Sequence, residues 1–230
     1  MAGISIYKTT LFRKILMSFT GLFIAFFLII HLFGNMFIIY FQDAAEAKLQ
    51  YNWWAETLSH NIFIEVIAIL LYASILLHVF DALYITIKNF RASGKGLKKD
   101  TRGQVSGWYK RNMGILGAII LIFLVIHLKD YWYVYKFDGG YDVFDENGRK
   151  DIYTIVEASF QNLWYVIVYV VAFVGLAYHL AHGVASGFRT LGVYNRSYIK
   201  IIKYFGLAFA ILIPLGYAII PIIVYLKNMS

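Results

Sequence analysis

Five apolar segments of this chain are each long enough to cross a lipid bilayer, and they limit the possible folds more than any motif does. A bilayer core takes about 20 apolar residues in helical form. Between the charged breaks, the pattern predicts helices over about 14–41, 61–89, 108–136, 155–189 and 198–226. Hydrophobic residues make up 60% of the chain. We therefore expect an all-α membrane protein with five transmembrane helices, forming a single domain over residues 1–230.

The connections between these segments are too short to hold a soluble domain. The segment from Gln42 to His60 contains two adjacent tryptophans, which favour the headgroup level of a bilayer, so a short surface helix is predicted there. The first apolar segment continues from Lys14 through Tyr40 without a small-residue cleavage site. We expect it to be a retained helix.

Basic and acidic residues separate onto opposite connections. Fifteen of the 21 basic residues lie at or just before the start of the first segment, or surround the second–third and fourth–fifth connections. The other two connections are acidic. Because Lys and Arg mark cytoplasmic loops, we expect the N-terminus to be cytoplasmic. The expected location is the bacterial inner membrane, as a multi-pass protein. The net charge of +8 then reflects topology, and no nucleic-acid partner is expected, since that would need a basic soluble face.

The chain contains no cysteine. This excludes c-type haem attachment, a cysteine-ligated iron–sulfur cluster and structural disulfides within this polypeptide. Histidine is left as the strong protein ligand for iron.

Four of the five apolar segments contain a histidine: His31, His78, His127 and His179, with His182 close behind the last. A buried imidazole in lipid needs a partner, so such residues point to a functional site. For each one alone, the simpler interpretation is a hydrogen bond to a neighbouring carbonyl. Their depths decide between the two interpretations.

Depth follows from the length of helix between each histidine and the nearest basic boundary. His31 follows Lys14, and His127 follows Arg111, at nearly the same separation along the chain. Helical rise places both imidazoles about 24–26 Å from the inner boundary. His78 precedes Lys88, and His179 precedes Arg189, at equal separations. The same rise places this second pair about 15 Å from that boundary.

Equal depth on different helices is what two axial ligands of one haem require. We therefore predict that His31 and His127 ligate the iron of an outer haem b, and that His78 and His179 ligate the iron of an inner haem b. Glycines near these residues would leave room for a flat ring; they are Gly34 in the first segment and Gly175, Gly183 and Gly187 in the fourth. His182 is an alternative ligand to His179, or a contact to a haem propionate.

The order and spacing of the sequence motifs around these histidines resemble those of the membrane cytochrome b subunit of succinate:quinone oxidoreductases, in its version with five helices and two haems. The matching motifs are His31-Leu32-Phe33-Gly34-Asn35, Leu76-Leu77-His78, Phe123-Leu124-Val125-Ile126-His127 and His179-x-x-x-Gly183-x-x-Ser186. The resemblance covers almost the whole chain. It departs from the pattern at Ala177, where some members carry a glutamate for proton transfer, so that pathway is not carried over.

The resemblance implies a succinate dehydrogenase or fumarate reductase complex, in which this chain is the membrane subunit. Its partners would be a flavoprotein subunit with FAD and an iron–sulfur subunit on the cytoplasmic face, and the inner haem would lie nearer the latter. Menaquinone would be the quinone substrate. Glu56 and Glu65 are candidate quinone contacts, while no catalytic residue is assigned and the physiological direction stays open.

Two alternatives remain. The cytochrome b subunit of a hydrogenase or formate dehydrogenase also places paired histidines on few helices. A haem-free membrane anchor or a transporter is supported by hydrophobicity alone, and a transporter would favour histidines converging on one site near the midplane, with carboxylates nearby.

Overall fold

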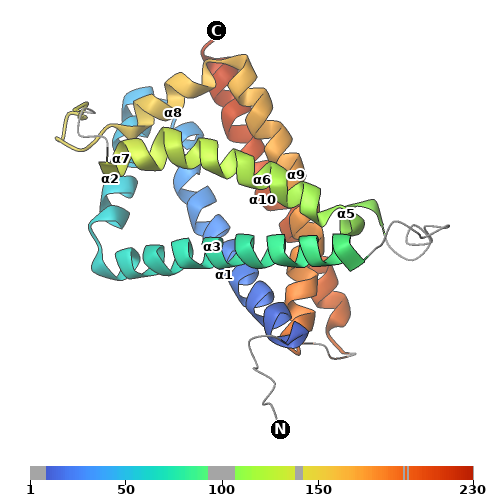
Figure 1. Cartoon of the computed structure of the whole chain (residues 1–230). Helices are drawn as coiled ribbons and strands as arrows, with labels where there is room; N and C mark the ends of the chain where they lie inside the picture. Colours follow the sequence, from blue (N-terminus) through green and yellow to red (C-terminus); the bar gives the residue numbers. More distant parts are fainter. Residues whose placement is uncertain (1–8, 93–106, 138–141, 194, 196, 230) are drawn as a thin grey trace.

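The structure confirms an all-α protein whose helices can cross a membrane (Figure 1). The computed structural model describes residues 9–92, 107–137, 142–193, 195 and 197–229. Within these ranges there is no strand, only an isolated bridge between Phe144 and Lys150. Five stretches are long and apolar enough to span: Leu11–Tyr40, Ile62–Arg91, Met113–Phe137, Leu163–Thr190 and Ile199–Lys227. These agree with the five predicted segments, and the protein is a multi-pass membrane protein.

The principal helices alternate in direction through the bundle. They are α1 (Thr10–Tyr40), α3 (Ile62–Ala92), α6 (Met113–His127), α9 (Leu163–Thr190) and α10 (Ile199–Lys227). Helix α1 packs against α3, α9 and α10, and α9 also packs against α6. We name the end where α1, α6 and α10 begin the N-side end, and the opposite end the C-side end. Figure 1 shows the start of α1 and the end of α10 at these two ends.

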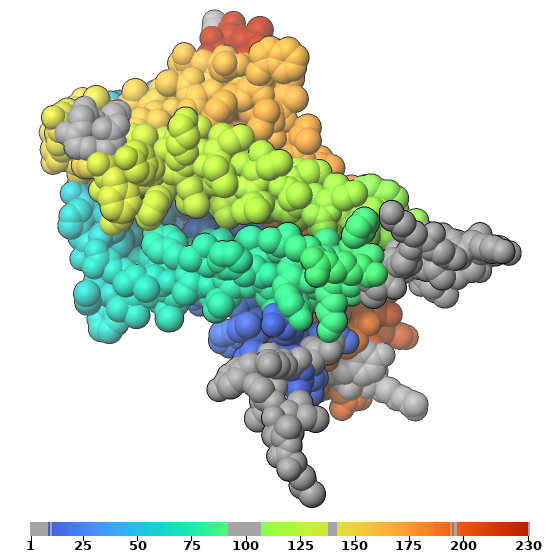
Figure 2. Space-filling view, viewed as in Figure 1, coloured from blue at the N-terminus to red at the C-terminus, as the bar shows by residue number. Residues whose placement is uncertain are grey.

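The predicted surface helix is present as α2 (Ala44–Ser59) at the C-side end. The side chain of Asp43 caps its start by accepting a hydrogen bond from the backbone N–H of Ala45, at 3.1 Å. The apolar outer surfaces of α3 and α6 lie next to each other on one face of the molecule (Figure 2). Large apolar side chains there are exposed, as expected for a surface that faces lipid.

The predicted third helix, 108–136, is wrong as a continuous element. Asn112 separates α5 (Trp108–Arg111) from α6, because its backbone leaves the helical region at φ −108 and ψ 25 and its amide donates to the carbonyl of Trp108 at 2.9 Å. After His127 the chain continues as a π-helix, η2 (Leu128–Tyr133), and then as α7 (Val134–Phe137). Hydrophobic periodicity predicts neither the break at Asn112 nor the π-helix after His127.

The predicted fourth helix, 155–189, is also divided. The structure has α8 (Ile152–Phe160), then a break, then α9 from Leu163. Asn162 begins α9 as its N-cap, since its side chain accepts from the N–H of Trp164 at 3.0 Å. The spanning part is therefore shorter than predicted, and α8 covers the C-side end of the bundle.

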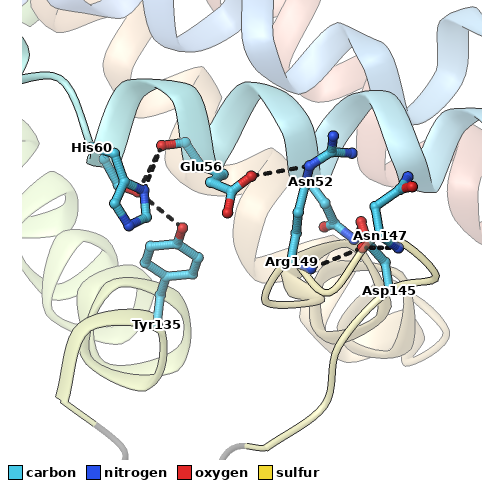
Figure 3. Close-up of polar contacts among 8 residues, drawn as sticks. Asn52, Glu56, His60, Tyr135, Asp145, Asn147 and Arg149 are labelled. Carbon is cyan, nitrogen blue, oxygen red and sulfur yellow. Dashed lines mark hydrogen bonds and ion pairs between the residues drawn. The ribbon is translucent and has the colours of Figure 1, made fainter.

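A polar cluster joins α2 to the segment 142–151 (Figure 3), and a further contact joins it to α8. Asn52 of α2 is fully buried, donates to Asp151 at 3.1 Å, and accepts from the N–H of Tyr153 at 3.1 Å. Asp145 accepts from the backbone N–H groups of Asn147 and Arg149, at 2.9 and 3.0 Å. Together these bonds hold three separate segments at the C-side end.

An ion pair completes this cluster. Lys48 Nζ lies 2.6 Å from Asp151 Oδ2, and the Asp151 side chain is almost fully buried. Burial raises the pKa of Asp151, but the Lys48 ammonium and the hydrogen bonds from Thr154 and Asn52 outweigh it, so the pKa lies below its ordinary value.

The lowered pKa makes stability depend on pH. Asp151 stabilises the fold fully above the ordinary aspartate value of 3.8, and this contribution is lost as the pH falls through the lowered value. We expect the thermal midpoint in detergent to fall between about pH 6 and about pH 2, and to fall less for Asp151→Asn. Asp142→Asn, which changes an exposed carboxylate of the same segment, should keep the wild-type profile. Equal slopes for wild type and Asp151→Asn would contradict this.

Candidate functional site

The structure brings the four spanning histidines together as two pairs on four different helices. His31 of α1 and His127 of α6 have ring centres 5.8 Å apart. His78 of α3 and His179 of α9 have ring centres 6.2 Å apart. These are the same two pairs that residue depth predicted. We call them the C-side pair and the N-side pair.

Two helices independently give the separation between the pairs. On α1, Thr20 contacts His78 of the N-side pair, and His31 of the C-side pair follows later on the same helix. On α9, Tyr169 contacts His127 of the C-side pair, and His179 of the N-side pair follows. At helical rise, each of these two stretches corresponds to about 15–17 Å. The pairs therefore occupy two distinct levels of the bundle.

One hydrogen bond fixes the tautomer of His78 at the N-side level. The Thr20 hydroxyl has one hydrogen, which it donates to the carbonyl of Leu16 at 2.8 Å. Its oxygen lies 3.2 Å from His78 Nδ1 and therefore accepts from the Nδ1–H of that ring. The Nε2 lone pair of His78 is then available to a metal, an arrangement common among metal-binding histidines.

The N-side level also has free space and an unpaired nitrogen. His179 Nδ1 is buried and has no hydrogen-bond partner within the described residues. A Cβ added at Gly117 or Gly183 would meet no atom of the described chain within 4 Å. Buried polar atoms are normally paired, so this unpaired nitrogen is consistent with a bound group at the N-side level.

Two of the predicted space-making glycines serve packing instead. At Gly187 an added Cβ would lie 3.1 Å from Leu22, so this glycine brings α9 close to α1. At Gly34 it would collide with the indole of Trp54, so this glycine admits a side chain of α2. Gly175 borders Ile119 at an ordinary 3.5 Å. Of the predicted glycines, Gly183 alone faces open space in the described chain.

Aromatic rings surround the C-side pair. Phe27 stacks on His31 with ring centres 5.1 Å apart, and Phe123 stacks on His127 at 5.6 Å. The Tyr169 hydroxyl lies 3.3 Å from His127 Nδ1. These rings hold both imidazoles in a rigid setting, since aromatic stacking adds to the energy of burial.

The π-helix after His127 directs three consecutive side chains to different neighbours. Asp130 accepts a hydrogen bond from the Tyr165 hydroxyl on α9, and Tyr131 is buried in the core. Trp132 donates to the Tyr72 hydroxyl on α3 at 2.7 Å. A π-bulge of this kind often marks a functional site. Periodicity analysis missed it because one inserted residue changes the helical register locally.

In both imidazole pairs the distance between ring centres is the one expected of two ligands of a single metal ion. A first-row metal binds a histidine nitrogen at about 2 Å, and that nitrogen lies about 1.2 Å from its ring centre, so ring centres about 6 Å apart are expected. Within the described ranges, no group of three or more His, Cys, Asp or Glu side chains could hold a metal ion. An ion with two protein ligands needs its other ligands from a non-protein group, and a planar macrocycle supplies four.

The other candidate residues from the sequence are His182, Glu56 and Glu65, and none of them makes a ring contact with either histidine pair in the described chain. The structure places His179 opposite His78, with His182 one turn further along α9. His60 lies at the exposed end of α2 with its Nδ1 3.0 Å from the carbonyl of Glu56. The Glu56 side chain pairs with Arg149 at 3.0 Å (Figure 3), and Glu65 is exposed in the first turn of α3.

Comparison of the chain with protein-family models, curated proteins and solved structures gave no significant match.

Proposed function

We propose that this chain is the membrane cytochrome b subunit of a succinate:quinone oxidoreductase, with two b haems between an iron–sulfur subunit and menaquinone. The observation that carries the proposal is the pair of imidazole contacts, with ring centres 5.8 and 6.2 Å apart, on four helices at two levels. One pair of this kind is a common packing contact. Two pairs at the spacing of a bis-imidazole metal site favour haem ligation.

In this proposal His31 and His127 hold the C-side haem, and His78 and His179 hold the N-side haem. When bound, two such groups supply one-electron carriers at two depths of the membrane. The protein contributes orientation, through the Thr20 hydrogen bond to His78 and the phenylalanines stacked on His31 and His127.

The proposed partners follow from the two ends of the bundle. Nine of the fifteen basic residues that the structure describes lie toward the N-side end. We propose that this end faces the cytoplasm and docks the iron–sulfur subunit, which joins the FAD-containing flavoprotein. Menaquinone would react near the C-side pair. Glu56 is already paired with Arg149, so the exposed Glu65 is the better candidate for a quinone contact. An electron crossing between the levels would be coupled to the membrane potential.

Haem stoichiometry tests the proposal directly. The pyridine haemochrome spectrum of the purified chain should give about two protohaems per polypeptide, since each imidazole pair takes one. A value near zero would reject haem binding. Copurification with a flavoprotein carrying succinate or fumarate activity would separate this proposal from a hydrogenase or formate dehydrogenase subunit.

The pairing of ligands gives a second prediction. His127→Ala should remove one low-spin signal in electron paramagnetic resonance and leave the other, because each level has its own two ligands. His78→Ala should remove the complementary signal. Replacement of the exposed His60 by alanine is the matched control and should preserve both. Loss of the same signal in the His127 and His78 variants would refute the two-level arrangement.

The fourth ligand can be distinguished from its neighbour. His179→Ala should abolish the N-side haem, because His179 is the residue whose ring faces His78. His182→Ala should retain that haem with at most a shifted signal. The reverse pattern would transfer the ligand role to His182.

A further inference from the structure

Each imidazole pair has one carboxylate a single helical turn beyond one of its histidines. Asp81 follows His78 by three residues, and Asp130 follows His127 by three. Side chains three residues apart lie on neighbouring positions of a helix surface. Neither His31 nor His179 has an acidic residue within four positions on either side. The two levels therefore share one feature beyond their imidazoles.

The carboxylate at the N-side level is buried. Asp81 is 4% exposed, and its Oδ1 accepts from Arg13 Nη1 at 2.6 Å. The Arg13 guanidinium also lies over the Tyr84 ring, 3.9 Å from its centre. Asp81 Oδ2 is buried and has no hydrogen-bond partner among the described residues. The arginine thus pairs with one oxygen of Asp81, while the other oxygen is buried without a partner in the described chain.

Burying a carboxylate such as Asp81 in a spanning helix costs free energy, and a positive charge nearby reduces that cost. Of the acidic residues that the structure describes, Asp81 is the one on the N-side half of the bundle; the others lie on α2, the start of α3, η2, the segment 142–151 and α8. Intramembrane carboxylates often act as counter-ions to a bound group. Arg13 is 30% exposed, so water weakens its field, whereas the carboxylate lies inside.

The carboxylate at the C-side level is in a different setting. The Asp130 side chain is 25% exposed and lies 3.1 Å from the ammonium of Lys129, which is itself 79% exposed. It also accepts a hydrogen bond from the Tyr165 hydroxyl. Water, the lysine and the tyrosine all reduce the field that Asp130 exerts on its surroundings.

We propose that Asp81 and Asp130 are counter-charges for the two oxidised iron centres, and that Asp81 acts the more strongly because it is buried; this rests on the proposed function. An iron(III) porphyrin with two neutral imidazoles carries one net positive charge, and its one-electron reduced form carries none. A nearby carboxylate therefore stabilises the oxidised form and lowers the midpoint potential. The field is stronger where the carboxylate is shielded from water.

Redox titration of the purified, haem-loaded chain tests this. Asp81→Asn should raise the equilibrium constant for reduction of the N-side haem about tenfold, which is about 59 mV for a one-electron couple. The C-side haem should stay at its wild-type potential. Asp130→Asn should shift the C-side haem in the same direction by less. Asp81→Glu, which keeps the charge, should stay close to the wild-type potential, and Asp142→Asn, at an exposed carboxylate to which no role is assigned, is the control.

The possible outcomes separate this inference from the proposed function. If wild type binds no haem, the proposed function fails. If two haems bind and Asp81→Asn leaves the N-side potential unchanged, or moves both potentials equally, the counter-charge role is wrong and the haem proposal stands. The two signals are assigned beforehand with the His127 and His78 variants.

A second measurement applies if Asp81→Asn does not assemble. In the wild-type protein labelled with ¹³C-carboxyl aspartate, the redox-difference infrared spectrum should show a carboxylate band that changes when the N-side haem is reduced, and Asp81→Glu should remove its isotope shift. Absence of any label-sensitive band during that reduction would overturn the proposal.

Discussion

A lipid interior supplies no hydrogen-bond partners, and this constraint governs every polar group inside the bundle. The chain meets it for several of these groups by pairing them across helices, whereas His179 Nδ1 and Asp81 Oδ2 have no partner in the described chain. Thr20 accepts from His78, Tyr169 contacts His127, and Arg13 binds Asp81. Each of these contacts joins two different spanning helices. The same interactions that satisfy buried polar atoms therefore also set which helices are neighbours and at what depth they meet.

The two histidine levels differ in their surroundings. At the C-side level, phenylalanine and tyrosine rings enclose the imidazoles. At the N-side level, Gly117 and Gly183 border open space, and a histidine nitrogen has no partner among the described residues. The carboxylate near each level differs as well, buried in one case and partly solvated in the other. Two sites built from the same residue types are thus electrostatically unequal.

The sequence alone determined the helical fold class, the five spans and the partition of histidines into two depths. Each of these follows from a local quantity: segment length, hydrophobicity, or the residue count from a charged boundary. Such counts work because a spanning helix has a fixed rise per residue and a bilayer has a fixed thickness. The direction of each imidazole around its helix was not available from these counts.

Tertiary structure alone decided the contacts between helices. Apolar periodicity could not show that Asn112 and Asn162 interrupt helices, because their effect comes from side-chain hydrogen bonds to the backbone. Nor could it show that Gly34 admits Trp54 while Gly183 faces open space, since a glycine looks the same in both settings. The pairing of Arg13 with Asp81 joins residues 68 positions apart. Local sequence fixes depth in the membrane, whereas the azimuth and neighbours of a side chain depend on how the helices pack.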